Sequence, residues 1–471
     1  MVSHMKNRPG ILIAAPQSGS GKTLITISLL RAYSSLGLKI GAFKCGPDYI
    51  DPMFHRKVLG LPSKNLDLFF VDREKLRKIY RDKNNSDFSI VEGVMGLYDG
   101  ADIKSYDASG YDIAVAIDIP VILVINAKGM GRSIISLIKG FKSDDDKNLI
   151  KGVILNRITK SFYERLKPLI EEETAVSCLG FFPENKDLNI SSRHLGLMQP
   201  EEIKDLNILI DKAAEVAKES IDLEKLREIA DCHCNKNDLQ KKDISDQDKK
   251  ILKDADNIKS LGVKRKRIAV ARDEAFSFYY EENLDILRKY FDLIFFSPIR
   301  DKKLPEDISG LIIGGGYPEE YAKELSFNNS MKESLLEKLN NKIPVIAECG
   351  GFMYLSRTLT TKDGKCHEMT GYIDSNISYM GKLVRFGYCE IEDKATGIKI
   401  RGHEFHYFDS DNNGDGCIMT KKTVDKSWQG IHRKGAQWIG YPHLYLPSSE
   451  EFINWFVFQV MNYPDKLKVK D

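Results

Sequence analysis

The stretch GILIAAPQSGSGKT, residues 10–23, decides the fold of the first part of the chain. Its apolar start predicts a buried strand, and the glycine-rich turn that follows leads into a helix. Backbone N–H groups of such a loop and of the helix N-terminus converge on phosphate groups. The match to G-x-x-x-x-G-K-[ST] departs only at its first position, where Pro16 replaces glycine. The residues that we expect to hold a nucleotide are Ser18, Gly19, Ser20, Gly21, Lys22 and Thr23.

The alternation of apolar strands and helical segments continues to about residue 230, and a second series begins near residue 267. Buried strands that alternate with helices predict a mostly parallel sheet with both faces covered. Residues 232–266 differ from both series, because they are rich in Lys, Asp and Asn and poor in apolar side chains. We therefore predict an α/β protein with two α/β domains, at residues 8–231 and 267–462, joined by a charged linker at residues 232–266.

The composition argues against several classes of function. The 471 residues carry a formal net charge of only +2, so we expect no nucleic-acid partner. The apolar runs are too short to cross a membrane, so we expect no membrane partner. Eight cysteines without regular spacing indicate a reducing compartment, and we expect the cytoplasm. Cys232, His233 and Cys234 could suggest zinc, but the sequence has no second ligand pair at a suitable spacing.

Carboxylates follow two further predicted strands of the first series. Asp48 and Asp51 stand in KCGPDYIDP, and Glu92 and Asp99 stand in VEGVMGLYDG. Ligands of open parallel sheets bind beyond the carboxyl ends of the strands, where carboxylates can hold Mg²⁺ or contact a substrate. The alternative is that each is a turn residue beside proline or glycine. We predict Thr23, Asp48 and Glu92 as Mg²⁺ ligands and Tyr49, Asp51 and Asp99 on the substrate side.

Asn156 ends another predicted strand, GVILN, at the same edge of the sheet. Its side-chain amide could read the base of a nucleotide. It could equally cap the helix that follows. We favour the contact with the base.

A cysteine stands at a strand-to-helix turn in IPVIAECGGFMYL, residues 343–355. The turn exposes the thiol of Cys349 to the helix N-terminus, which is expected to lower the thiol pKa. The N–H group of Gly350 can donate to an oxyanion, and Gly315 in GGGYPE can supply a second donor. The alternative is an inert core cysteine, but Glu and two Gly residues around it make poor core material.

A thiol nucleophile needs a histidine base. His443 in GYPHLYLP is the residue that we predict for this role. His403 and His406 in RGHEFHY are the alternatives.

These motifs together resemble a class I, triad-type glutamine amidotransferase domain. The usual elbow of that class is G-x-C-x-G, whereas this chain has Ala347 at the first position and keeps Gly351. Such domains usually end in H-x-E, but here Leu444 and Tyr445 follow the histidine. The third triad member is therefore absent or supplied from elsewhere, as in the branch that serves corrinoid synthesis.

The ordered set of motifs resembles the cobyrinate a,c-diamide synthase family from about residue 10 to residue 460. The set includes APQSGSGKT, KCGPDYIDPMFH, VEGVMGLYDG, SSRHLGLMQPEE, ARDEAFSFYYEENL, GGGYPEE, AECGGFMYL and RGHEFHY. The resemblance implies a carbon–nitrogen ligase that uses ATP, Mg²⁺ and L-glutamine. It would convert the a- and c-acetate groups of a tetrapyrrole acid, the corrin cobyrinate, into amides through acyl phosphates. The first domain would then be the ATP-dependent synthetase, with a fold similar to dethiobiotin synthetase, and a homodimer is one open state of assembly.

Two alternatives stay open at this point. A related enzyme amidates the equivalent acetates of nickel sirohydrochlorin, and sequence alone does not readily separate it. A P-loop ATPase switch with a vestigial glutaminase domain is the alternative of a different class. Such switches carry a lysine early in the loop, where this chain has Gln17.

Overall fold

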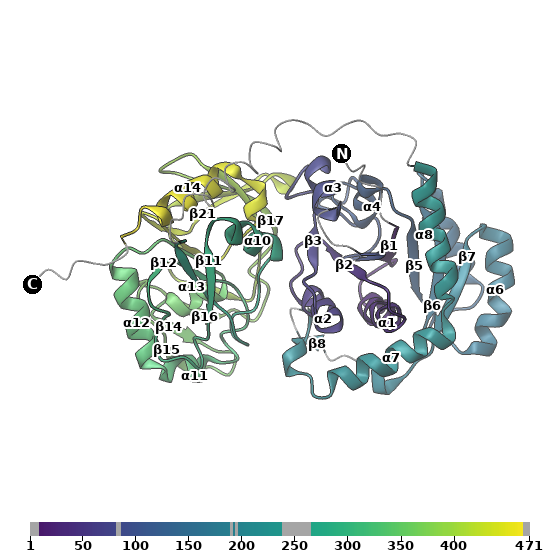
Figure 1. Cartoon of the computed structure of the whole chain (residues 1–471), viewed down its shortest axis with the longest axis horizontal. Coiled ribbons are helices and arrows are strands. Elements are labelled where there is room, and N and C mark those ends of the chain that lie inside the picture. Colours follow the sequence, from purple (N-terminus) through teal and green to yellow (C-terminus); the bar gives the residue numbers. More distant parts are fainter. Residues whose placement is uncertain (1–8, 82–85, 189–191, 194–195, 238–264, 465–471) are drawn as a thin grey trace, which may run out of the picture. The chain divides into compact units, whose positions relative to one another are not determined.

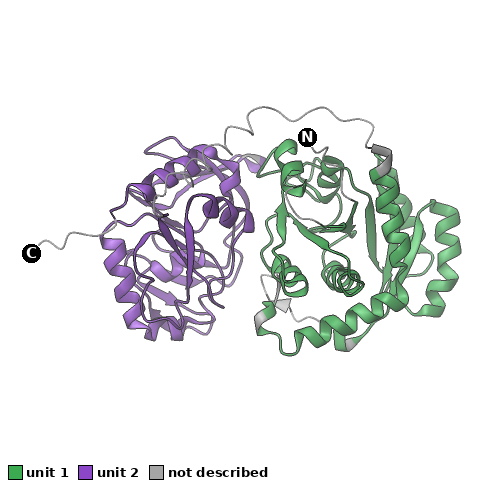
Figure 2. Ribbon diagram, viewed as in Figure 1, with its two compact units in different colours: residues 1–243 green, residues 244–471 purple. Residues whose placement is uncertain are grey.

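The computed structural model describes residues 9–81, 86–188, 192–193, 196–237 and 265–464. The chain divides into two compact units, residues 1–243 and residues 244–471 (Figure 2). Each unit is an α/β structure built around its own sheet, and each is described separately below.

The first unit is built on a seven-stranded sheet in the order β3-β2-β4-β1-β5-β6-β7, in which all neighbours are parallel. Its strands are β1 (Gly10–Ala14), β2 (Ile40–Cys45), β3 (Lys64–Leu66), β4 (Phe88–Glu92), β5 (Val121–Asn126), β6 (Ile150–Asn156) and β7 (Ser177–Phe182). A short pair, β8 (Ser192–Arg193) and β9 (Gly196–Leu197), follows. The central strands are buried along their whole length, as expected for a sheet covered on both faces.

Helices cover both faces of this sheet. They are α1 (Lys22–Ser35), α2 (Ile50–Leu59), α3 (Arg73–Arg81), α4 (Gly110–Ile117), α5 (Ser133–Ser143), α6 (Lys160–Thr174), α7 (Leu206–Ser220) and α8 (Leu223–Asn237), with short 3₁₀ turns η1 (Lys186–Leu188) and η2 (Pro200–Glu202). In Figure 1, α1 and α2 lie on one side of the sheet and α3 and α4 on the other. Helix α1 begins directly after Gly21, whose φ of 95° is readily adopted only by glycine. The glycine-rich loop thus turns the chain from β1 into α1.

The second unit is built on a six-stranded sheet in the order β11-β10-β12-β13-β23-β22, parallel except at its last pair. The strands are β10 (Arg267–Ala271), β11 (Asp292–Phe296), β12 (Ile308–Ile313), β13 (Val345–Glu348), β22 (His432–Lys434) and β23 (Gln437–Gly440). Alternate residues of its strands enter two different cores. Leu311 and Val345 belong to one core, and Ile312 and Ile346 belong to the other. Both faces of this sheet are therefore buried.

Two further sheets stand beside the parallel one. An antiparallel sheet has the order β21-β20-β17-β18-β24, and a four-stranded sheet has the order β15-β14-β16-β19. Their strands are β14 (Thr358–Thr360), β15 (Cys366–Glu368), β16 (Asn376–Tyr379), β17 (Arg385–Asp393), β18 (Lys399–His406), β19 (Phe408–Ser410), β20 (Cys417–Lys421), β21 (Lys426–Gly430) and β24 (His443–Leu444). The helices are α10 (Glu281–Tyr290), α11 (Ala322–Phe327), α12 (Asn329–Asn340), α13 (Gly350–Leu355) and α14 (Glu450–Met461), with 3₁₀ turns η3 (Lys422–Val424) and η4 (Leu446–Ser448).

The predicted α/β class with two α/β domains is confirmed. The strands expected from continuous apolar runs all form, but β3 and β7 were not predicted. Only three residues long, β3 is too short to show a pattern, and Gly180 interrupts β7. Helix α8 continues to residue 237, and residues 238–264 of the predicted linker lie outside the described residues. The domain boundaries stay predictions.

Among the helices that the structure describes, none is both long and apolar enough to span a bilayer.

A buried ion pair connects the parallel and antiparallel sheets of the second unit. Arg433 in β22 donates to both carboxylate oxygens of Asp393 in β17, at 3.1 and 2.9 Å. The guanidinium also lies over the rings of Trp438 and Trp455, at 5.0 and 4.9 Å. Burial alone would raise the pKa of Asp393, but hydrogen bonds from Arg433 and Thr396 hold it below its ordinary value of 3.8.

We predict that Asp393→Ala lowers the unfolding free energy of the second unit by about 3 kcal/mol, because it leaves a buried arginine without its partner. All three tryptophans of the sequence, residues 428, 438 and 455, lie in this unit, so tryptophan fluorescence in urea reports its unfolding. Since the folded-state pKa is depressed, the contribution of the pair is complete above pH 3.8 and is lost as pH falls below that value. The matched control is Glu392→Ala, which removes an exposed pair with Lys399. An equal loss in both variants would contradict the prediction.

Candidate functional sites

The phosphate loop of the first unit is folded around its lysine. Lys22 is buried, and its Nζ donates to the carbonyl oxygen of Met95 at 2.5 Å and to that of Gln17 at 3.4 Å. The Ser20 hydroxyl also donates to the Gln17 carbonyl, at 2.9 Å. Burial and the nearby charge of Lys44 lower the pKa of Lys22 to about 8. The negative charge of a bound polyphosphate would favour the protonated form of Lys22.

Asn156 secures the same loop from the end of β6. Its Nδ2 donates to the carbonyl of Ser20 at 2.8 Å, and the side chain is buried. A Cβ on Gly21 would lie 2.2 Å from that nitrogen, so only glycine fits here. In this structure the amide holds the loop. Its predicted contact with a nucleotide base stays a prediction.

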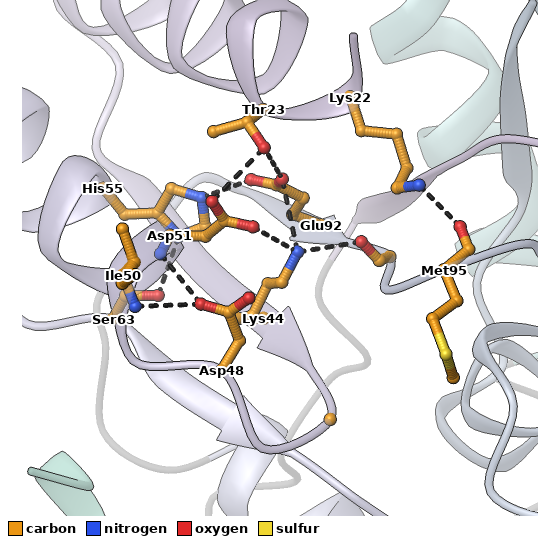
Figure 3. Close-up of polar contacts among 12 residues, drawn as sticks. Lys22, Thr23, Lys44, Asp48, Ile50, Asp51, His55, Ser63, Glu92 and Met95 are labelled. Carbon is orange, nitrogen blue, oxygen red and sulfur yellow. Dashed lines mark hydrogen bonds and ion pairs between the residues drawn. The ribbon is translucent and has the colours of Figure 1, made fainter. Parts of the chain in front are cut away.

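The structure brings the predicted carboxylates Asp51 and Glu92 to Thr23, at the start of α1 (Figure 3). The Thr23 hydroxyl donates to Glu92 Oε1 at 2.7 Å and lies 3.3 Å from Asp51 Oδ1. Between the carboxylates stands Lys44, whose Nζ is 2.5 Å from Asp51 Oδ2 and 3.3 Å from Glu92 Oε1. The lysine also donates to the Gly93 carbonyl at 2.9 Å. These side chains come from α1, β2, α2 and β4, which meet at one edge of the sheet.

Two members of this cluster were missed by sequence reasoning. Lys44 is 2% exposed, and His55 is fully buried with its Nε2 2.8 Å from Glu92 Oε2. The other ring nitrogen of His55 lies 2.9 Å from the Ser63 hydroxyl, which itself donates to a backbone carbonyl. A lysine inside the apolar run IGAFKC was the available signal, because a buried lysine is rare unless it is paired.

The charges of the cluster are strongly coupled. Burial disfavours a charge on Lys44, yet Asp51 and Glu92 raise its pKa above its ordinary value. Burial would raise the pKa of Glu92, but Lys44 and His55 hold it below its ordinary range. Burial, with the charges of Asp48 and Glu92, raises the pKa of Asp51 well above its ordinary value. The mutual attraction of Lys44 and Glu92 thus favours the charged form of both.

The cluster has the oxygen donors that Mg²⁺ prefers, namely a hydroxyl and one or two carboxylates beside a phosphate loop. Among the described residues, no group of three or more His, Cys, Asp and Glu side chains could by itself hold a metal ion. Mg²⁺ usually takes few protein ligands and completes its shell with water and substrate phosphates. Thr23 and Glu92 fit such a site, and Asp51 is close to them.

The remaining predicted residues of the first unit lie around this cluster. Asp48 accepts the backbone N–H groups of residues 50 and 51, at 2.9 and 3.0 Å, and so caps α2. Tyr49 is buried beside it. Asp99 is exposed, and its Oδ2 accepts the N–H group of Gly96 at 2.8 Å. Their roles toward Mg²⁺ or substrate stay predictions.

In the second unit, Cys349 lies on a strained turn between β13 and α13. Its φ of 48° and ψ of −101° are unusual for a residue with a side chain, and such strain costs about 1–3 kcal/mol. The elbow is tightly packed, because a Cβ on Gly351 would lie 2.2 Å from the Ile313 carbonyl oxygen.

The expected lowering of the thiol pKa is wrong. Burial raises the pKa of Cys349 well above its ordinary value, and a hydrogen bond from the Gly350 N–H offsets only part of this. Nearby carboxylates, Glu319 first among them, add to the rise. The thiol therefore needs a cationic partner before it becomes a thiolate.

His443 lies three residues after Gly440, the last residue of β23. Strand β23 pairs with β13, which ends directly before Cys349. The Cys349 N–H donates to the Gly440 carbonyl at 2.8 Å, three residues before the histidine. A Cβ on Gly315 would lie 2.3 Å from His443 Cε1, so the imidazole packs directly on the GGG loop. The amide nitrogen of Gly316 would lie 3.2 Å from a Cβ on Gly350, which makes Gly316 an oxyanion donor to consider beside the predicted Gly315.

The two alternative histidines occupy different places. The His403 ring stacks on that of His443, at 5.0 Å between centroids and 19° between planes. His406 Nε2 lies 3.0 Å from Glu404 Oε2, and its Nδ1 lies 2.6 Å from the Phe408 carbonyl. Both nitrogens of His406 are thus engaged, which leaves it poorly suited to take a proton from a thiol.

The sequence Cys232-His233-Cys234 lies in α8. His233 Nε2 lies 2.9 Å from Asp118 Oδ1. Its neighbours Cys232 and Cys234 are exposed and half-buried, respectively.

Comparison with known proteins covers both units. Residues 11–197 match the CobQ/CobB/MinD/ParA nucleotide binding domain, and residues 267–450 match the CobB/CobQ-like glutamine amidotransferase domain. Cobyrinate a,c-diamide synthase of Clostridium tetani is 37% identical over 94% of this chain and 98% of its own length. The proteins of that name from Priestia megaterium and Picrophilus torridus are 35% and 38% identical, each over 96% of this chain and over 97% and 99% of their own lengths. The chain therefore belongs to the cobyrinate a,c-diamide synthase family, whose members are glutamine-dependent carbon–nitrogen ligases with an ATP-binding domain.

Proposed function

We propose that this protein uses ATP and glutamine to convert the a- and c-acetate carboxylates of cobyrinate into amides. The observation that carries the proposal is the presence on one chain of two sites that solve different parts of amide synthesis. A carboxylate does not react with ammonia, because its leaving group would be oxide. Ammonia at neutral pH is mostly protonated and must be released where it is used. The first unit addresses the leaving group, and the second addresses the nitrogen.

The first step is activation of the carboxylate. A carboxylate oxygen attacks the γ-phosphorus of ATP, ADP departs, and an acyl phosphate forms. Mg²⁺, held by Thr23 and Glu92, would neutralise charge on the phosphates. Lys22 would bind the β- and γ-phosphates from the loop. The buried Lys44 would hold Asp51 and Glu92 in place beside them. Ammonia then attacks the acyl carbon, phosphate leaves, and nitrogen loses a proton.

The second unit supplies the ammonia. The Cys349 thiolate attacks the amide carbon of glutamine, and His443 passes the thiol proton to the departing nitrogen. Backbone N–H groups at Gly350 and Gly315 would stabilise the oxyanion. Water then hydrolyses the thioester to glutamate and restores the thiol. Because burial raises the thiol pKa, forming the thiolate requires a histidine that takes the proton.

The first prediction concerns the phosphate loop. Lys22→Ala should reduce amide formation at least ~10²-fold with glutamine and with ammonium alike, since both routes need the same ATP-dependent activation. Mono- and diamide products are measured by mass spectrometry, and ADP release is measured in parallel. Lys160→Ala, at an exposed lysine, is the matched control. Full activity of Lys22→Ala with ammonium would overturn the nucleotide-site assignment.

The second prediction separates the two units. Cys349→Ser should lose nearly all glutamine-dependent synthesis and keep synthesis from ammonium salt at high pH, because the synthetase site needs only ammonia. His443→Ala should show the same split, with a loss of about 10²–10⁴-fold in glutamine use. Cys366→Ser, at an exposed cysteine, should behave like the parent protein. Parent-like glutamine turnover by Cys349→Ser would make the thiol structural, and loss of ammonium-dependent synthesis would refute the division of labour.

The third prediction concerns the substrate. Cobyrinate and nickel sirohydrochlorin are offered side by side, each with ATP and glutamine, and the diamides are quantified by mass spectrometry. We expect a larger kcat/KM for cobyrinate, in line with the names of the relatives. A larger kcat/KM for the nickel tetrapyrrole would move the substrate assignment. Glutamine hydrolysis that needs neither tetrapyrrole nor ATP, with no amide product, would contradict both.

A further inference from the structure

The glutaminase site has a histidine but lacks a carboxylate two residues after it. Leu444 and Tyr445 follow His443, and neither carries a carboxylate that could stabilise an imidazolium. A histidine that exchanges a proton with a thiol normally has a third group on its other ring nitrogen. That group fixes which nitrogen carries the proton and stabilises the imidazolium. In this chain, a carboxylate beside that ring nitrogen of His443 has to come from another segment.

Glu348 can supply this carboxylate, although it precedes His443 in the sequence instead of following it. It is the last residue of β13 and directly precedes Cys349. Its Oε2 lies 3.7 Å from His443 Nδ1, an ion-pair distance rather than a full hydrogen bond. Its Oε1 accepts the backbone N–H of Leu444 at 3.0 Å. One carboxylate therefore accepts a backbone N–H of the segment that carries the histidine and lies within ion-pair distance of its ring.

The surroundings leave the imidazole little freedom. One ring face stacks on His403, and the GGG loop lies against Cε1. His403 Nδ1 is itself 3.1 Å from the Tyr280 hydroxyl. Nδ1 of His443 faces Glu348, so a proton exchanged with the thiol would be carried by Nε2. Both Glu348 and the whole His443 residue are buried, at 8% and 2% exposure, so water screens their interaction weakly.

Parallel pairing explains how this arrangement arises. Glu348 is in register with Gly440 of β23, and the chain reaches His443 three residues later. The base and the residue before the nucleophile thus leave the sheet at the same edge. A carboxylate at position 348 can reach the histidine without any contribution from the segment after it.

We propose that Glu348 is the positioning residue of the glutaminase site and takes the part of the missing triad acid. It keeps the proton of neutral His443 on Nδ1, so that Nε2 can accept the thiol proton, and it then stabilises the imidazolium. This inference rests on the proposed glutaminase function of Cys349 and His443.

Other titratable groups near the reacting pair must be considered in any pH measurement. The groups that face His443 or Cys349 are Glu348, His403, Glu319, Glu404 and Tyr441. Burial and the charge of His443 hold the pKa of His403 well below its usual value, so His403 stays neutral. Burial raises the pKa of Tyr441 well above its usual range. Neither group is then expected to titrate between pH 6 and 10.

The test replaces Glu348 by Gln in the full-length protein. The amide oxygen can still accept the Leu444 N–H, which leaves the NH₂ group toward Nδ1 and keeps the proton on Nε2, the wrong nitrogen. We expect glutamine-dependent kcat to fall ~10²-fold. The acidic limb of the pH profile of kcat/KM should move down by about one pH unit, because the His443 imidazolium loses its counter-charge and gives up its proton more readily. KM for glutamine should change little.

A conservative variant and a second readout separate positioning from folding. Glu348→Asp keeps the charge and should return the acidic limb to its parent position even if the rate stays reduced. The pH dependence of iodoacetamide alkylation at Cys349, read by peptide mass spectrometry, should move in the same way as the kinetic limb. Ammonium-dependent synthesis should persist in both variants, and parent-like unfolding in urea, read from the tryptophans of the second unit, shows that this unit is folded. Glu333→Gln, at an exposed glutamate of α12, is the matched control.

The outcomes separate a failure of the Glu348 proposal from a failure of the proposed glutaminase function. Reduced activity of Glu348→Gln with an unmoved acidic limb and unmoved alkylation profile would make Glu348 merely structural and overturn the proposal. Parent-like activity of Glu348→Gln, with Cys349→Ser inactive on glutamine, would refute the proposal and leave the glutaminase function intact. Parent-like glutamine use by Cys349→Ser would refute the function itself.

Discussion

Parallel pairing of strands is the constraint on which both sites depend. Strands that run in one direction end at one edge of the sheet, so the residues after them meet there however far apart they lie in sequence. In the first unit this places Thr23 after β1 close to Glu92 at the end of β4. In the second it places Cys349 after β13 beside the segment that follows β23. The same geometry therefore builds a charged cluster in one unit and a strained thiol in the other.

The charged cluster of the first unit is held together by mutual neutralisation. Two carboxylates and a lysine lie within hydrogen-bond distance in a buried setting, where any unpaired charge would be costly. Lys44 and His55 favour the ionised form of Glu92, and His55 occupies the second oxygen of that carboxylate.

In the second unit, Cys349 costs the fold free energy but stands at the proposed glutaminase site. Cys349 adopts a strained backbone conformation, and its burial opposes ionisation. Burial disfavours the free thiolate, so the proposed nucleophile needs a partner that can take its proton. Glu348, adjacent in sequence to the nucleophile, can lie beside that partner because the β13–β23 pairing brings the histidine back to it.

The sequence by itself determined the elements whose signal is local. Continuous apolar runs predicted the central strands, Gly19 and Gly21 before Lys22 predicted the phosphate loop, and AECGG predicted the elbow of Cys349. The ordered motifs also identified the family. Local chemistry was sufficient here because each motif combines an apolar strand with the residue types that a turn requires.

Only the tertiary structure decided which distant groups meet. It paired Lys44 with Asp51 and Glu92, placed His55 behind Glu92, and put Glu348 rather than a following residue beside His443. It also reversed the expected direction of the thiol pKa, because burial is a property of the whole unit and outweighs the amides of one turn. Contacts between strand ends depend on strand order, and strand order is set by the packing of complete layers rather than by any single segment.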